Sequence, residues 1–248
     1  MDSSYTPLEK NHKEWSKKMP VLLLCAAVLL ALYIREKLIA YSIKAALLKS
    51  VVSVLFIAVA VWSWYRSSHG VLGIFVILGL SFGLLGDIWL DFKYVFRTHA
   101  DPFTYAGFAA FGIGHILYMT GLLAQYMAGT KLFYVILPIF LGIILSLGNA
   151  VLEKPMKLHF GKMKGIVIGY GVLLFSTVLL SGSLALANHW QVRTLNLFFA
   201  GAVLFALSDL VLSGTYFGVG RERPVDIISN YLLYYSGQFL IAYSLLYL

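Results

Sequence analysis

The sequence contains little cysteine and little charge. Its single cysteine, Cys25, excludes an internal disulfide and any metal site built from several cysteines. Only 12% of the 248 residues are charged, whereas 60% are hydrophobic and the mean hydropathy is +0.84. A soluble domain of this length does not need so much apolar surface, so the composition is that of a polytopic membrane protein.

Long polar segments are also scarce, and the apolar runs define the expected fold. Each run is close to the ~20 residues that an α-helix needs to cross a bilayer, and the alternation typical of membrane β-barrels is absent. We therefore predict an all-α bundle of eight transmembrane helices over residues 20–248, preceded by a polar tail over residues 1–19. The predicted spans are 20–40, 43–65, 71–91, 103–127, 132–150, 165–187, 194–216 and 227–248.

The first apolar run follows several lysines, as the apolar core of a signal peptide does. It continues into Arg35-Glu36-Lys37 without a small-residue cleavage site, which favours a retained first helix. This span is short, and we expect Arg35 and Lys37 to lengthen it by extending their side chains toward the membrane surface.

The basic residues are distributed unevenly among the loops. A net charge of +8 would suit nucleic-acid binding in a soluble protein, but lysines and arginines in short loops are what membrane topology requires, so we expect no nucleic-acid partner. The odd-numbered loops carry Arg35, Lys37, Lys44, Lys49, Lys93, Arg97, Lys154, Lys157, Lys162, Lys164, Arg221 and Arg223. The even-numbered loops carry Arg66, Lys131 and Arg193, and the N-terminal tail adds four lysines.

The positive-inside rule then places the odd-numbered loops in the cytoplasm and both termini outside. The lysines of the tail favour the opposite orientation. The expected location is the plasma membrane in a bacterium and the endoplasmic reticulum otherwise.

Two segments are similar to segments about 120 residues later. LLGDIWL around Asp87 and ALSDLVL around Asp209 lie 122 residues apart, and GHIL and GQFL lie 123 residues apart. This spacing fits a parallel repeat of four plus four helices about an axis along the membrane normal. Chance similarity among the few residue types of membrane helices is the alternative.

Asp87 and Asp209 interrupt two of the apolar runs. A carboxylate in hydrocarbon costs roughly 2.5–3.5 kcal/mol on insertion scales, so such a residue is expected to face the bundle interior and to serve a function. The two spans run in the same direction and place both aspartates at similar depth, near the odd-numbered loops, in one layer with Lys49. A structural ion pair between Lys49 and one aspartate is the alternative, and it leaves the second aspartate unexplained.

The neighbours of Asp87 on its helix divide into small and charged residues. Gly79 and Gly83 lie on the same face at i−8 and i−4, where small residues let a neighbouring helix or a ligand approach closely. Asp91 lies one turn beyond Asp87, and we expect it to be a solvated residue at the helix end.

Other polar residues also lie at depth. His115 is the one histidine within a predicted span, so it either packs with a hydrogen bond or faces the same cavity as the aspartates. A zinc site would need more ligands, and we expect no metal. A polar face of the last span either makes interhelix hydrogen bonds or forms a wall of a polar cavity. This face comprises Tyr231, Tyr234, Tyr235 and Gln238.

Taken in chain order, these segments resemble the lysoplasmalogenase (YhhN-like) family of multi-pass membrane proteins. The resembling segments are Lys49 in the second span, GLLGD ending in Asp87, FAAFGIGHILY around His115, LFALSDLVL around Asp209, and YYSGQFL over residues 234–240. The resemblance implies an eight-helix hydrolase without a metal or organic cofactor. Its substrate would be a lysoplasmalogen, a one-chain glycerophospholipid with a vinyl ether, cleaved to a fatty aldehyde and glycerophosphoethanolamine or glycerophosphocholine.

The resemblance implies that Asp87 and Asp209 are the catalytic carboxyl groups. The substrate-binding positions that it implies are Lys49, His115, Tyr118, Tyr234, Tyr235 and Gln238. Cleavage of a vinyl ether needs one carboxylic acid to protonate carbon and one carboxylate to stabilise the cation or activate water, as in glycosidases. We expect the aspartate nearer Lys49 to be the ionised one and the other to be the acid. Lys49 is also expected to reach the lipid phosphate.

Two further classes of protein are compatible with intramembrane carboxylates. A proton- or cation-coupled transporter of lipids or small molecules would use the same Asp and His residues as a relay and would return its lipid intact. A receptor or scaffold has no need for two costly charges at one depth. The expected partners are a lysophospholipid substrate and membrane lipid, and the sequence does not indicate an oligomeric state.

Overall fold

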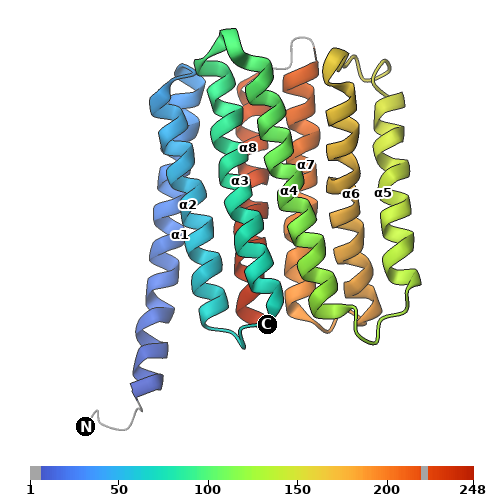
Figure 1. Ribbon diagram of the computed structural model, residues 1–248. Helices are drawn as coiled ribbons and strands as arrows, with labels where there is room; N and C mark the ends of the chain where they lie inside the picture. Colours follow the sequence, from blue (N-terminus) through green and yellow to red (C-terminus); the bar gives the residue numbers. More distant parts are fainter. Residues whose placement is uncertain (1–6, 219–222) are drawn as a thin grey trace.

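The computed structural model describes residues 7–218 and 223–248, with side chains described from Met19 onward, and this part of the chain forms eight α-helices (Figure 1). The helices are α1 (Pro7–Ile39), α2 (Ile43–Tyr65), α3 (Val71–Val95), α4 (Ala100–Tyr126), α5 (Phe133–Val151), α6 (Lys164–Ala187), α7 (Arg193–Phe217) and α8 (Pro224–Ser244). Each predicted span overlaps one of them, so the predicted all-α bundle is confirmed. The assignment of residues 1–19 as a polar tail remains a prediction, because residues 1–6 lie outside the described part and α1 is helical from Pro7.

Seven of the helices in the described part, α1 to α7, are long and apolar enough to cross a membrane. The eighth, α8, is less apolar because polar side chains occupy one of its faces, and these side chains are buried inside the bundle. α8 runs alongside the others and ends at the same end of the bundle as α2, α4 and α6 (Figure 1). The protein is therefore an integral multi-pass membrane protein.

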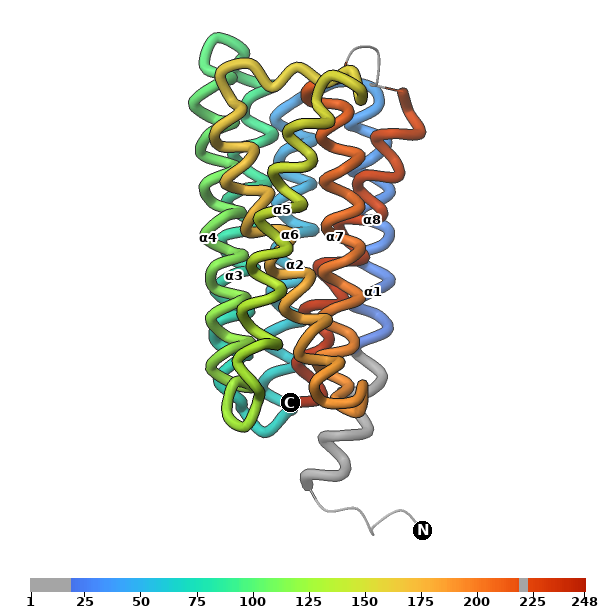
Figure 2. Tube along the Cα trace, turned by 90° about the vertical axis from the view of Figure 1, so that its right-hand side faces the viewer, coloured from blue at the N-terminus to red at the C-terminus, as the bar shows by residue number. Residues whose placement is uncertain are grey.

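The helices alternate in direction, and Figure 2 shows them running along one common axis. We call the end of the bundle at which α1, α3, α5 and α7 finish the odd-loop end. The residues at the helix ends favour the observed helix starts. Ser42 caps α2 by accepting a hydrogen bond from the Ala45 N–H at 3.2 Å, and Pro224 begins α8, where a proline lacks only an N–H that would be unpaired anyway.

The helix contacts have the arrangement expected of a four-plus-four repeat. α3 packs along α4 as α7 packs along α8, and α2 contacts α8 as α6 contacts α4. Glycines lie at both crossings: a Cβ atom on Gly79 would lie 3.1 Å from the Gly114 carbonyl oxygen, and one on Gly201 would lie 2.7 Å from that of Gly237. These two pairs are related by offsets of 122 and 123 residues, so the same close crossing occurs in both halves.

The first helices of the two halves differ at the odd-loop end. α1 continues to Ile39 and brings the buried Tyr33 and Lys37 to this end, whereas α5 stops at Val151 and is followed by a connection over residues 152–163. This connection folds back on the bundle, because the His159 N–H donates to the Phe217 carbonyl oxygen at 2.8 Å. The first half therefore offers helical side chains where the second half has a loop.

Alanine at Gly201 is expected to destabilise the protein, because its Cβ atom would lie 2.7 Å from the Gly237 carbonyl oxygen and 2.8 Å from Ile241 Cγ1. Overpacking of this kind costs about 1–3 kcal/mol. The unfolding temperature of the detergent-solubilised protein should therefore fall. Gly169→Ala in α6 is the matched control, since nothing lies within 4 Å of a Cβ atom built there. Equal unfolding temperatures for both variants would show that the α7–α8 crossing tolerates a side chain.

Candidate active site

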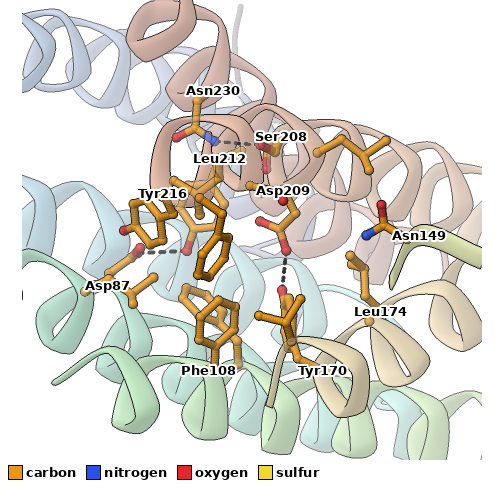
Figure 3. Close-up of a pocket in the computed structure, with 18 of the residues that line it drawn as sticks. Asp87, Phe108, Asn149, Tyr170, Leu174, Ser208, Asp209, Leu212, Tyr216 and Asn230 are labelled. Atoms are coloured by element: carbon orange, nitrogen blue, oxygen red, sulfur yellow. Dashed lines mark hydrogen bonds between the residues drawn. The ribbon is translucent and has the colours of Figure 1, made fainter. Parts of the chain in front are cut away.

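An internal cavity lies near the odd-loop end and is lined by residues of α2 to α8 (Figure 3). The cavity has a volume of about 70 Å³. Figure 3 shows Asp87 on one side, Asn149 on the other, and Asp209 with Tyr170 between them. Because both aspartates line this one space, the prediction that they share a layer is confirmed.

Asp87 is surrounded by donors. Lys49 Nζ lies 3.1 Å from Asp87 Oδ1, and Oδ2 accepts hydrogen bonds from Ser53 Oγ at 2.5 Å and from the Tyr234 hydroxyl at 2.8 Å. Only 2% of Asp87 is exposed. Because all three partners donate, both oxygens act as acceptors, which is the arrangement of an ionised carboxylate. Asp87 is thus the aspartate nearer Lys49, and its ionised state stays a prediction.

The ion pair of Asp87 is part of a longer alternating chain of charges, which we call the charge chain: Lys37, Asp91, Lys49 and Asp87. Asp91 Oδ1 lies 2.7 Å from Lys37 Nζ and 3.7 Å from Lys49 Nζ. Each of the four residues is at most 5% exposed. Isolated buried ions are costly, and here each one has a neighbour of opposite sign.

Two expectations from the sequence, for Asp91 and for Lys37, are thus wrong, and the expectation for Lys49 meets contacts that it did not include. Asp91 is not a solvated helix-end residue, because it lies one turn from Asp87 on the same buried face of α3 and binds two lysines. Lys37 does not extend to the membrane surface, because Asp91 draws its ammonium group into the bundle. Lys49 also has both of its carboxylate partners inside the protein, so its ammonium group is not available to a phosphate in the way that we expected.

Asp209 has different surroundings from Asp87. Its Oδ2 accepts a hydrogen bond from the Tyr170 hydroxyl, and its carboxyl group points into the cavity (Figure 3). Within the described residues, no lysine or arginine forms an ion pair with Asp209. Asp209 is half-buried rather than enclosed, because its side chain borders the cavity. The two carboxyl groups of one cavity therefore have unlike partners.

The polar face of α8 both lines the cavity and bonds to neighbouring helices, so both interpretations of it apply. Tyr231 and Tyr234 line the cavity. Behind that wall, the Tyr118 hydroxyl donates to Gln238 Oε1 at 3.4 Å, and Gln238 Nε2 donates to the Tyr234 hydroxyl at 3.2 Å. The Tyr235 hydroxyl donates to the Lys49 carbonyl oxygen at 3.3 Å. These bonds hold Tyr234 in place as a donor to Asp87.

His115 lies outside the set of residues that line the cavity. Its Nδ1 is 3.2 Å from Thr177 Oγ1, and its ring centroid is 5.1 Å from that of Phe205. Its Nε2 has no hydrogen-bond partner among the described residues. His115 is thus a packed residue between α4 and α6, and the structure does not place it with Asp87 and Asp209.

The structure adds Tyr170, Ser53 and Asn230 to the residues of the site. Asn230 Nδ2 donates to the Ser208 carbonyl oxygen at 2.7 Å on the cavity wall (Figure 3). Signals for two of the three were present in the sequence. Ser53 follows Lys49 by one helical turn. The position that corresponds to Lys49 in the second repeat, 122 residues later, is directly next to Tyr170. Asn230 had no such signal.

The chain was also compared with known proteins. A family model described as the YhhN family matches residues 44–245, a range that includes every residue lining the cavity but excludes Tyr33 and Lys37 of α1. Neither the comparison with curated proteins nor that with solved structures gave a match. The family resemblance expected from the five sequence segments is confirmed.

Replacing Lys37 by methionine is expected to destabilise the protein by about 3–5 kcal/mol, because it removes one partner of a buried ion pair. Adding Asp91→Leu to the same chain should recover much of this loss, since Lys49 and Asp87 then remain as a neutral pair. A double-mutant cycle on the unfolding free energies of the four proteins measures the interaction. Additive losses would contradict a direct Lys37–Asp91 coupling.

Proposed function

The chain belongs to the YhhN family, and from this premise we propose that it is a membrane-embedded hydrolase that cleaves the vinyl ether bond of lysoplasmalogens. The products would be a fatty aldehyde and glycerophosphoethanolamine or glycerophosphocholine. One observation carries the proposal: Asp87 and Asp209 line a single cavity, the first beside an ammonium group and the second beside a tyrosine hydroxyl. Two carboxyl groups in unlike environments are the usual basis of a division between acid and carboxylate.

Asp209 is the proposed general acid. A carboxyl group in an apolar bundle without a cationic partner favours its neutral form, and the rim of the cavity lets its oxygen meet a ligand. Tyr170 orients it from α6. Asp87 is the proposed carboxylate, since Lys49 and two hydroxyl donors hold it ionised.

The proposed reaction consumes one water molecule. Asp209 gives its proton to the β-carbon of the vinyl ether, where the double-bond electrons form the new C–H bond. The α-carbon and the ether oxygen then form an oxocarbenium ion, which the negative charge of Asp87 stabilises. Water then attacks the α-carbon and its proton returns to the Asp209 carboxylate, which gives a hemiacetal. The hemiacetal then breaks its bond to the glycerol oxygen, which receives the proton that the hemiacetal hydroxyl loses, and the aldehyde and the alcohol separate.

The side of the cavity away from Asp87 suits the hydrocarbon chain of such a substrate. Leu174 lies on that side (Figure 3), Phe175 and Leu210 also line the cavity, and Leu210 is 40% exposed. We propose that the chain lies here and reaches the bilayer sideways between helices. The substrate would then enter from the membrane with its vinyl ether toward the aspartates.

The proposed site faces the cytoplasm, at the plasma membrane of a bacterium or at the endoplasmic reticulum otherwise. Lys37 and Lys49 no longer count as loop residues, because they are buried. The odd-numbered loops still carry ten of the remaining basic residues, one of which, Arg221, lies outside the described chain, against three in the even-numbered loops. This excess supports the orientation given by the positive-inside rule.

A lipid or small-molecule transporter coupled to protons remains the second candidate. The four-plus-four arrangement of helices favours it, because internal repeats of this kind occur in transporters. The two candidates differ in chemistry, since a transporter returns its lipid unchanged.

Aldehyde release from lysoplasmenylethanolamine by the detergent-purified protein tests the proposal. We expect Asp209→Asn to lower kcat by at least about 100-fold, because it removes the general acid. Asp87→Asn should also abolish most of the activity, since the cation loses its stabilising charge.

Asp226→Asn is the matched control, because Asp226 pairs with Arg223 at the start of α8 and does not line the cavity. Its activity should equal that of the natural protein. Undiminished aldehyde release by the folded Asp87→Asn and Asp209→Asn variants would refute their catalytic roles. Intact lipid recovered from the folded natural protein would favour the transporter.

A further inference from the structure

Two neutral polar side chains of the cavity wall have no part in the proposed reaction. They are Asn149 of α5 and Ser213 of α7, which we call the amide–hydroxyl pair. Ser213 Oγ is buried and has no hydrogen-bond partner among the described residues. Figure 3 shows the Asn149 amide at the cavity without a hydrogen bond to any other residue drawn. Buried polar groups are costly when unpaired, so this pair suits a ligand that forms hydrogen bonds with both side chains.

Several other polar side chains of the wall are already engaged inside the protein. The hydroxyl groups of Tyr170 and Tyr234 donate to the two aspartates. The Asn230 amide donates to the Ser208 carbonyl oxygen at 2.7 Å. A ligand would have to break these bonds to use the same groups, whereas the amide–hydroxyl pair offers its donors and its acceptors without such a loss.

The amide–hydroxyl pair lies between the aspartates and the odd-loop end. Ser213 follows Asp209 by four residues, so it lies on the same face of α7 and about 6 Å closer to that end. Asn149 precedes the last residue of α5, Val151, by two residues. Leu174 lies deeper, because α6 begins at the odd-loop end and Leu174 follows its first residue by ten positions, a rise of about 15 Å. From the bundle interior outward, the wall is thus apolar, then carboxylic, then neutral and polar.

A one-chain ether lipid carries its groups in the same order. Its hydrocarbon chain is followed by the ether oxygen and then by the free hydroxyl on the second carbon of glycerol. Only a few covalent bonds separate the β-carbon of a vinyl ether from this hydroxyl, a span comparable with the helical rise of about 6 Å between Asp209 and Ser213. With its β-carbon at Asp209, such a lipid would place its hydroxyl at the amide–hydroxyl pair.

We propose that Asn149 and Ser213 bind the free glycerol hydroxyl of a one-chain lipid and thereby select one-chain over two-chain lipids. The inference rests on the proposed function for the class of lipid. The lipid hydroxyl donates to the Asn149 amide oxygen and accepts from the Ser213 hydroxyl. A two-chain lipid carries an ester at this carbon, which has no proton to donate, so the amide oxygen stays unpaired.

Binding of uncleavable lipids to the detergent-solubilised protein tests this assignment without turnover. The probes are a saturated alkyl-ether lysophosphoethanolamine and its 2-deoxy analogue, which lacks only the glycerol hydroxyl. By titration calorimetry, the natural protein should bind the hydroxylated lipid at least about tenfold more tightly, because the deoxy lipid leaves both side chains unpaired. The double variant Asn149→Leu, Ser213→Ala should bind the two lipids with similar affinities.

Matched variants separate this site from a general effect of lost polar groups. Asn188→Leu with Ser229→Ala removes the same two groups from positions that do not line the cavity, and it should keep the preference. Ser213→Thr retains the hydroxyl group and should keep it as well. If the double variant at the cavity is unfolded, Ser213→Ala alone serves, because it removes a single oxygen atom, and it should lose part of the preference.

Three outcomes would overturn the proposal. Equal affinities of the natural protein for both probes would show that the lipid hydroxyl does not reach the amide–hydroxyl pair. A preference retained by the folded cavity variants would assign recognition to other residues. A two-chain ether phosphoethanolamine bound as tightly as the one-chain lipid would contradict the selection. Because no bond is cleaved, absence of aldehyde release would refute the proposed function while leaving this result intact.

Discussion

The charge chain determines how the first half of the bundle is arranged. Buried ions must have partners of opposite sign, because the cost of removing them from water exceeds what an isolated charge can recover. Lys37 reaches Asp91 only because α1 extends to Ile39, and Asp87 and Asp91 meet Lys49 only because they lie one turn apart on the face of α3 that α2 covers. The length of α1 and the orientations of α2 and α3 follow from these contacts.

The second half uses the same frame with different chemistry. The glycine crossing of α3 and α4 recurs between α7 and α8, and Asp209 stands where the repeat places the counterpart of Asp87. The residue that meets Asp209 from α6 is Tyr170, whereas Lys49 meets Asp87 from the corresponding helix α2. A near-symmetric scaffold thus holds two aspartates that differ because one partner is a cation and the other a hydroxyl group.

The eight helices could be predicted because each apolar run is as long as a bilayer is thick, and depth along a helix placed Asp87, Asp209 and Lys49 in one layer. What could not be predicted is which polar residues pair across helices. Asp91 and Lys37 lie near helix ends, where solvation is the usual outcome, and only the packing of α1 against its neighbours buries them. For His115 the sequence left packing and the cavity as alternatives, and only the structure shows that its side chain lies beside Thr177.

The balance of charges within the charge chain bears on how the protein responds to an energised membrane. Moving one elementary charge through a potential of about 100 mV changes the free energy by about 2.3 kcal/mol. Two lysines and two aspartates that shift together carry no net charge, so the electric field does no work on them. The four ions at depth thereby add no net charge on which a membrane voltage could act when they move together.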